Sequence, residues 1–443
     1  MISDRLFYLD KKFKKMLKKV YSQSWLLWRI SYMIRESKDF ETIAVDLNKF
    51  ILYKWKIFTN EYTSTQEMLY EIDTMEKMEL FIKNELVNLD HNLALVFLDF
   101  DRWDMLCYTD FMWVNSLYVN MDWEISWSIN RLIWWMSFLD YKYLWIIRKF
   151  GYNINNLTPY SNIKRLDPWM IYKAKIWFLF EEYTKIQLTP TTKDLKLSLL
   201  DYVEDCVKRR ICDPELSWET VWVLCSWWLD SSIITALLLK HKPDDVTLKF
   251  FTTENAEDSK YAQDLAKYLG IDLIKVDVKQ LKSKEIFDIN ETPVDLWSVI
   301  PNIALFQAVK EQWINYVFTW DWADELFRWY KRNAEDFDYH YHDILNELTY
   351  YHLPRLEKAA THIWLKMYAP FMGREVVMYS LIKNIKNFKQ DLKDFCHWLI
   401  PDSIIERTKE PLKNKEIRED KKAYQEAFLD KFISYAHENE NIH

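Results

Sequence analysis

The chain has 443 residues, 49% of them hydrophobic and 28% charged, which is typical of a globular protein long enough for two domains. A formal net charge of -8 at pH 7 and a pI near 5.7 argue against a nucleic-acid-binding surface. No apolar run is long enough to span a membrane, and five cysteines without a CxxC pair indicate neither a disulfide framework nor a zinc site, so we expect a cytoplasmic protein with no membrane or nucleic-acid partner.

Residues 9–21 carry six lysines around Phe13, Leu17 and Val20, a spacing that predicts a basic amphipathic helix. We interpret it as a solvated surface helix, because nothing else in the chain indicates a membrane or nucleic acid. Residues 43–188 contain short apolar or alternating segments that predict strands paired as hairpins. Ser64, with Glu67 three residues later, predicts the start of a helix. The polar segment 190–194 is the predicted linker.

The second half of the chain alternates between strand and helix patterns. A helical pattern over 195–211 comes first. The strands and helices that alternate after it predict a parallel sheet with helices on both faces, in which ligands bind at the carboxyl ends of the strands. Beyond Thr319 the pattern is mostly helical. The predicted strands are 221–224, 246–252, 273–276 and 316–319, and the predicted helices between them are 231–239 and 259–269.

The stretch 221–232 reads VWVLCSWWLDSS, which predicts a buried strand, a turn and the start of a helix. This layout binds phosphate through backbone N–H groups, but the turn then needs glycine, and here it holds Trp227 and Trp228. The chain has 3 glycines and 23 tryptophans, whereas a chain of this length usually has about 7% glycine. The glycines and tryptophans counted together come close to that usual glycine content. We hypothesise that most of the tryptophans are glycine in the natural protein, a stop-type codon having been translated as tryptophan.

With glycine at these positions, residues 226–232 read SGGLDSS and residues 319–330 read TGDGADELFRGY. The two motifs resemble the pyrophosphate-binding loop and the acidic signature of the asparagine synthetase family. The resemblance implies that residues 191–443 form an α/β doubly wound parallel-sheet PP-loop domain, similar to adenine nucleotide alpha hydrolases, with a helical C-terminal part. It also implies that residues 1–190 form a degenerate class II glutamine amidotransferase-like domain, an α+β glutaminase-like sandwich.

The family reaction activates a carboxylate with ATP and Mg²⁺, releases pyrophosphate, and forms an amide and AMP when ammonia attacks the acyl-adenylate. The resemblance favours aspartate as the carboxylate. It assigns proton transfer to Asp321, and the segment 400–409 resembles the element that places a lysine, here Lys409, against the phosphates. The expected magnesium ligands are Asp230 and Asp324, and the expected nucleotide-binding residues are Leu224, Ser226, Trp227, Trp228, Leu229, Asp230, Ser231, Ser232, Thr252, Thr319 and Trp320.

Several positions depart from the family pattern. A class II glutaminase uses an N-terminal cysteine, but this sequence begins Met1-Ile2 and has no cysteine before Cys107. Lys54 stands where an asparagine helps to form the oxyanion hole, and Thr65 stands where an aspartate holds glutamine. We therefore expect glutamine hydrolysis to be lost.

Two further departures lie in the ATP domain, where Gly373 replaces an aspartate and Lys366 replaces a glutamate. They leave the acceptor open. One alternative is a cyclising amide ligase similar to β-lactam synthetase or the lasso-peptide cyclases, and another, if the tryptophans are real, is a non-catalytic binding scaffold. A homodimer is compatible with the sequence.

Overall fold

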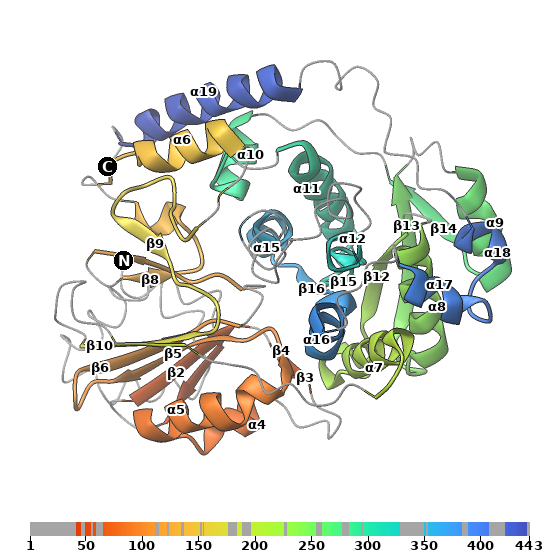
Figure 1. Cartoon of the computed structure of the whole chain (residues 1–443), viewed down its shortest axis with the longest axis horizontal. Helices are drawn as coiled ribbons and strands as arrows, with labels where there is room; N and C mark the ends of the chain where they lie inside the picture. Colours follow the sequence, from red (N-terminus) through yellow and green to blue (C-terminus); the bar gives the residue numbers. More distant parts are fainter. Residues whose placement is uncertain are drawn as a thin grey trace. The chain divides into compact units, whose positions relative to one another are not determined.

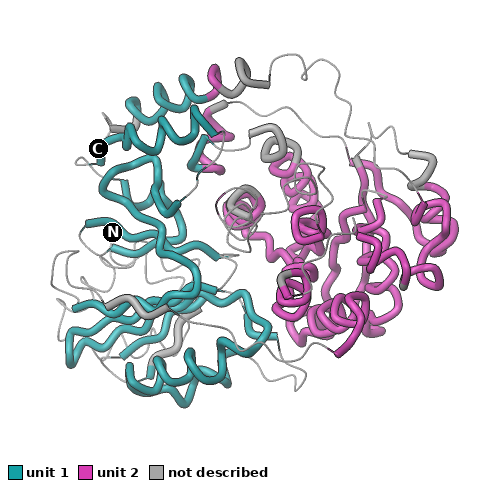
Figure 2. Tube along the Cα trace, viewed as in Figure 1, with its two compact units in different colours: residues 1–191, 291–294, 429–443 teal, residues 192–290, 295–428 magenta. Residues whose placement is uncertain are grey.

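The chain divides into two compact units in a computed structural model (Figure 2). Unit 1 comprises residues 1–191, 291–294 and 429–443, and unit 2 comprises residues 192–290 and 295–428. The helix at 9–21 and the linker at 190–194 lie outside the described residues. The structure describes residues 41–45, 49–54, 56–58, 65–110, 115–121, 124–133, 137–150, 153, 155–175, 184–187, 196–225, 228–253, 259–276, 283–293, 296–327, 350, 353–382, 389–406 and 421–440.

Unit 1 contains a six-stranded antiparallel sheet in the order β1-β2-β5-β6-β10-β11 and a three-stranded sheet in the order β8-β7-β9. Its strands are β1 (Glu41–Ala44), β2 (Lys49–Lys54), β3 (Ile57–Phe58), β4 (Asp90–His91), β5 (Ala94–Asp99), β6 (Asp104–Tyr108), β7 (Tyr118–Asn120), β8 (Ile125–Ser126), β9 (Ile163–Arg165), β10 (Met170–Lys175) and β11 (Thr184–Gln187). Its helices include α4 (Thr65–Tyr70), α5 (Met75–Asn84) and α6 (Tyr141–Phe150).

Alternating side chains of the six-stranded sheet form two apolar cores. One face, with Leu52 and Val96, packs with Val119 and Ile125 of the three-stranded sheet. The opposite face packs against α5 through residues such as Met78. Of the segments expected to form hairpins, those at 93–111 and 113–128 do so as β5–β6 and β7–β8. The segment 50–58 does not, because β2 and β3 lie in different sheets. In contrast, β2 pairs with β5 across the intervening helices, a long-range contact that local patterns do not predict.

Unit 2 contains a five-stranded parallel sheet in the order β14-β13-β12-β15-β16, as the alternating sequence pattern predicts (Figure 1). Helices α8 and α9 lie on one side of this sheet, and α11 and α15 lie on the other (Figure 1). Its strands are β12 (Thr220–Leu224), β13 (Thr247–Thr253), β14 (Leu273–Val276), β15 (Tyr316–Phe318) and β16 (Lys366–Tyr368). Its helices include α7 (Leu199–Ile211), α8 (Leu229–His241), α9 (Ser259–Leu269), α10 (Ser283–Asn290), α11 (Leu296–Lys310), α12 (Ala323–Leu326), α15 (Leu353–His362), α16 (Arg374–Ile382), α17 (Gln390–Cys396) and α18 (Asp402–Ile405).

Local chemistry explains where these elements begin. Helix α7 starts with a capping box, in which Ser198 and Asp201 each bind the other's backbone N–H. Strand β12 and the first turns of α8 are almost wholly buried, because β12 is the middle strand of the sheet. Strand β16 lies in the segment expected to be mostly helical, where only three residues pair with β15.

Helix α19 (Lys421–Glu440) extends from unit 2 into unit 1. None of the described helices has both the length and the apolar composition that a membrane-spanning segment requires.

We expect Leu237→Ala to lower the free energy of unfolding of unit 2 by about 2–5 kcal/mol, because the fully buried Leu237 side chain of α8 leaves a cavity. Urea denaturation followed by far-UV circular dichroism measures this change. The matched control is Tyr268→Ala on α9, a residue 54% exposed, which should change stability by only about 0.5 kcal/mol. Equal losses in the two variants would contradict the placement of α8 in the core.

Candidate functional site

The order of the parallel strands determines where the site lies. Strand β12 has β13 on one side and β15 on the other, so the chain leaves β12 in one direction and later returns to its opposite edge. In open α/β sheets ligands bind at the carboxyl ends of the strands beside such a reversal. The turn from β12 into α8 and the turn from β15 into α12 both lie at this edge, and they hold most of the predicted site residues.

The first turn follows Leu224, the buried last residue of β12. Trp228 is the N-cap of α8, and the hydroxyl of Ser231 donates a hydrogen bond of 3.0 Å to its carbonyl. Leu229, Asp230, Ser231 and Ser232 form the buried first turn of the helix. Ser226 and Trp227 lie outside the described residues, and Thr252 is a buried residue near the end of β13.

The second turn follows β15. The backbone N–H of Thr319 donates to the carbonyl of Tyr368 on β16 at 2.9 Å, which extends the sheet pairing by one residue. Trp320 and Asp321 come next and are half-buried. Trp322 is the N-cap of α12, and Asp324 lies in the first turn of that helix.

The carboxylates of Asp230 and Asp324 converge on one ammonium group, that of Lys389. The Lys389 Nζ donates to Asp324 Oδ1 at 2.5 Å and also binds Asp230 Oδ2. The side chains of Lys389 and Asp230 are each 3% exposed, and that of Asp324 is 13% exposed. The structure therefore brings together the two residues predicted as magnesium ligands, although they lie in separate turns.

The protonation state of Lys389 follows from its surroundings. Burial alone would lower the pKa of this lysine, but the negative charges of Asp230 and Asp324, which also accept its hydrogen bonds, outweigh that effect and raise the pKa. Lys389 is therefore a permanent cation at neutral pH. A single positive charge between two carboxylates leaves the group with a formal charge of about -1.

Sequence reasoning missed Lys389. Its neighbours, NFKQDLKDF, are the lysines, aspartates and amides of an ordinary solvated helix, so no local pattern distinguishes it. Lys389 is the N-cap of α17, with φ of 65° in the left-handed region. Lys409, the lysine that the sequence did predict for the phosphates, lies outside the described residues.

The residues at this edge suit a metal-bound nucleotide. Carboxylate oxygens are the ligands that Mg²⁺ prefers, and two of them point at one position. The hydroxyls of Ser232 and Thr319 are buried and have no hydrogen-bond partner among the described residues. Buried polar groups of this kind mark places where a bound molecule completes the hydrogen bonding.

The two departures predicted in the acceptor region have structural explanations. A Cβ atom at Gly373 would lie 2.1 Å from the Sγ of Cys206, so a larger residue there requires the Cys206 side chain to move. Lys366 pairs with Glu215 at 2.6 Å, which uses its ammonium in an ion pair near the surface.

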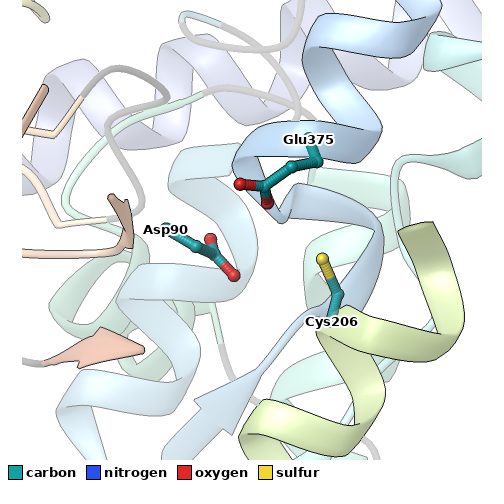
Figure 3. Close-up of side chains that lie close together, drawn as sticks. All are labelled: Asp90, Cys206 and Glu375. Carbon is teal, nitrogen blue, oxygen red and sulfur yellow. The ribbon is translucent and has the colours of Figure 1, made fainter. Parts of the chain in front are cut away.

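Cys206 on α7 and Glu375 on α16 are shown in Figure 3, and Arg209 hydrogen-bonds to both. The third residue labelled there, Asp90, belongs to unit 1, so we assign no metal site to this group. Burial raises the pKa of Cys225 and of Cys396 to about 12. These thiols therefore stay protonated at neutral pH and are poor nucleophiles.

Unit 2 is thus an α/β domain in which two acidic side chains meet at the carboxyl ends of two adjacent parallel strands. The asparagine synthase family matches residues 223–342, which include both turns. A Methanocaldococcus jannaschii protein named "Putative asparagine synthetase 1 (glutamine-hydrolyzing)" is 25% identical over 267 residues, 58% of this chain and 48% of that relative. The match thus spans about half the length of the curated relative. Residues 223–342 are therefore similar to the asparagine synthase family, whose members are ATP-using ligases.

We expect Lys389→Met to destabilise the protein by about 3–5 kcal/mol, because it leaves the carboxylates of Asp230 and Asp324 without their cation. Added Mg²⁺ should raise the melting temperature of this variant more than that of the parent, since the ion would replace the lost charge. Differential scanning fluorimetry with and without Mg²⁺ measures both effects.

The matched control is Lys366→Met, which breaks an ion pair whose side chains are 38% and 35% exposed and should cost about 1 kcal/mol or less. Mg²⁺ should not restore its stability. An equal response of the two variants to Mg²⁺ would contradict a cation site between Asp230 and Asp324.

Proposed function

We propose that this protein is an asparagine synthetase-type ligase that adenylates a carboxylate with ATP, releasing pyrophosphate, and joins the acyl group to ammonia, releasing AMP. The observation that carries this proposal is the convergence of Asp230 and Asp324 on Lys389 at the carboxyl ends of β12 and β15. These turns lie within the region similar to the asparagine synthase family.

The reaction places strong demands on charge. The carboxylate oxygen attacks the α-phosphorus, the bond to the β-phosphate breaks, and pyrophosphate leaves with several negative charges. Mg²⁺ bound by Asp230 and Asp324 would supply positive charge to that leaving group. In this structure the ammonium of Lys389 occupies the position between the two carboxylates, so it would move aside when Mg²⁺ binds both of them. Its positive charge would then be available to the leaving group, and the proposed role of Lys409 is similar.

The second step forms the amide. Ammonia attacks the acyl carbon, AMP leaves with the bonding electrons, and the nitrogen loses a proton. Asp321 is the proposed acceptor of that proton, because it is a carboxylate in the turn between β15 and α12 that also holds Asp324. The hydroxyls of Ser232 and Thr319 would hydrogen-bond to the nucleotide.

We propose aspartate as the carboxylate and free or partner-supplied ammonia as the nitrogen source. Loss of glutamine hydrolysis is supported by Thr65, whose hydroxyl accepts the backbone N–H of Ile57 at 3.0 Å and so has a structural role in unit 1. Lys54, at the end of β2, stands at the position expected for an oxyanion-hole asparagine. The glutaminase-like identity of unit 1 remains part of the proposal.

A cyclising amide ligase is the second candidate. The tight contact between Gly373 and Cys206 leaves no space for the aspartate that the family has at this position unless the Cys206 side chain moves. A different carboxylate and an amine within the same substrate would satisfy the same adenylation chemistry.

The test supplies ATP, Mg²⁺ and aspartate to the protein with glycine at its tryptophan positions, and measures AMP, pyrophosphate and asparagine. We expect asparagine with ammonia and none with glutamine, and a decrease in AMP release on the order of 100-fold in Asp324→Ala, which removes a proposed metal ligand. The control variant Glu215→Ala breaks the pair with Lys366 and should stay near parental activity.

AMP release that needs no ammonia and yields no asparagine would favour the cyclising ligase. Absence of AMP with every carboxylate offered, from a protein that folds, would overturn the ligase proposal. Activity with glutamine alone would contradict the loss of glutamine hydrolysis.

A further inference from the structure

The backbone conformation of the tryptophans is abnormal for that residue. Among the described residues, eight residues other than glycine have a positive φ, and six of them are tryptophan. A bulky side chain in this left-handed region is an outlier, because its Cβ approaches the following carbonyl oxygen too closely. The six, with φ from 56° to 76°, are Trp103, Trp169, Trp218, Trp313, Trp322 and Trp364.

Two helix ends provide a direct comparison. Helix α9 ends with Gly270 in the left-handed region (φ 67°), and the N–H of Ile271 returns to the carbonyl of Ala266 at 2.9 Å. Helix α15 ends in the same way, with Trp364 at φ 60° and the N–H of Leu365 bonded to the carbonyl of Ala360 at 2.9 Å. This helix-ending motif normally has glycine at its left-handed position. Trp364 thus occupies the position that Gly270 occupies in α9.

Other turns show the same preference. Trp169 follows Pro168 between β9 and β10, and a positive φ directly after proline is typical of a type II turn with the sequence Pro-Gly. Trp103 is the last residue of the loop between β5 and β6, where glycine commonly takes the left-handed conformation. Trp313 ends the turn after α11.

The indole rings gain little that could offset this strain. Trp218 and Trp313 are 86% and 92% exposed, so packing does not stabilise them. Trp322 has the opposite problem, because its indole N–H is buried without a hydrogen-bond partner among the described residues. A buried tryptophan usually finds such a partner.

The described glycines, in contrast, occupy positions that favour glycine. Gly270 has a positive φ, and a Cβ at Gly373 would require the Cys206 side chain to move. Gly270 and the six left-handed tryptophans therefore share a backbone conformation that favours glycine.

We infer that the natural protein has glycine at the six left-handed tryptophan positions, Trp103, Trp169, Trp218, Trp313, Trp322 and Trp364. The codon written as tryptophan at these positions is read as glycine in the cells that make the protein. At Trp322 the change removes a buried indole from the turn between Asp321 and Asp324. Its benefit to nucleotide binding there rests on the proposed function, but the identity of the six residues does not.

The test is tandem mass spectrometry of tryptic peptides from the protein purified from its own cells. Two peptides are decisive: residues 311–328, which contain Trp313 and Trp322, and residues 359–366, which contain Trp364. We expect each to be lighter by the difference between tryptophan and glycine at these positions. Tryptophan at any of the three overturns the inference, whatever reaction the protein catalyses.

The second test compares the melting temperatures of variants of the recombinant protein, expressed with tryptophan at all of these positions. Trp364→Gly should raise the melting temperature by about 2 °C or more, because glycine relieves the left-handed strain. Trp145→Gly is the matched control, since Trp145 is 57% exposed in the regular helix α6, where glycine is unfavourable and should lower the melting temperature. Equal decreases in both variants would contradict a requirement for glycine at 364.

Discussion

One buried cation holds the carboxyl edge of the parallel sheet together. Lys389 binds Asp230 from the turn after β12 and Asp324 from the turn after β15, two segments far apart in the chain. Without a cation these carboxylates would repel each other in a water-excluded place. The pairing of Asp230 and Asp324 with Lys389 stabilises the fold, and it also keeps two carboxylates together where a metal-bound nucleotide would lie. Stability and proposed function therefore depend on the same three side chains.

The sequence alone predicted most of unit 2, because alternation of buried strands and helices has few three-dimensional solutions. Strand β14 and helix α9 have their predicted limits, and α8 begins two residues before its predicted start. The meeting of Asp230 and Asp324 follows from that topology. Lys389 does not, because its position depends on a tertiary contact with no local signal. The β2–β5 pairing and the short strand β16 were missed for the same reason.

The two units have kept different features. Unit 1 has two buried apolar cores on opposite faces of its six-stranded sheet, and it carries a lysine at position 54 and a threonine at position 65. Unit 2 has kept a charged site in which even the buried lysine is compensated. A core and a site are selected independently, since apolar packing maintains a sheet whether or not its polar residues react.

The tryptophans show why composition and conformation should be considered together. An excess of tryptophan could by itself reflect an aromatic-rich surface, and one left-handed tryptophan could reflect local strain at a functional site. At Trp218 and Trp313, which are 86% and 92% exposed, packing of the indole ring does not offset the strain. The same substitution accounts for the missing glycines, the helix ends and the phosphate turn. A single change in how one codon is read explains all three, whereas real tryptophans would need a separate explanation at each position.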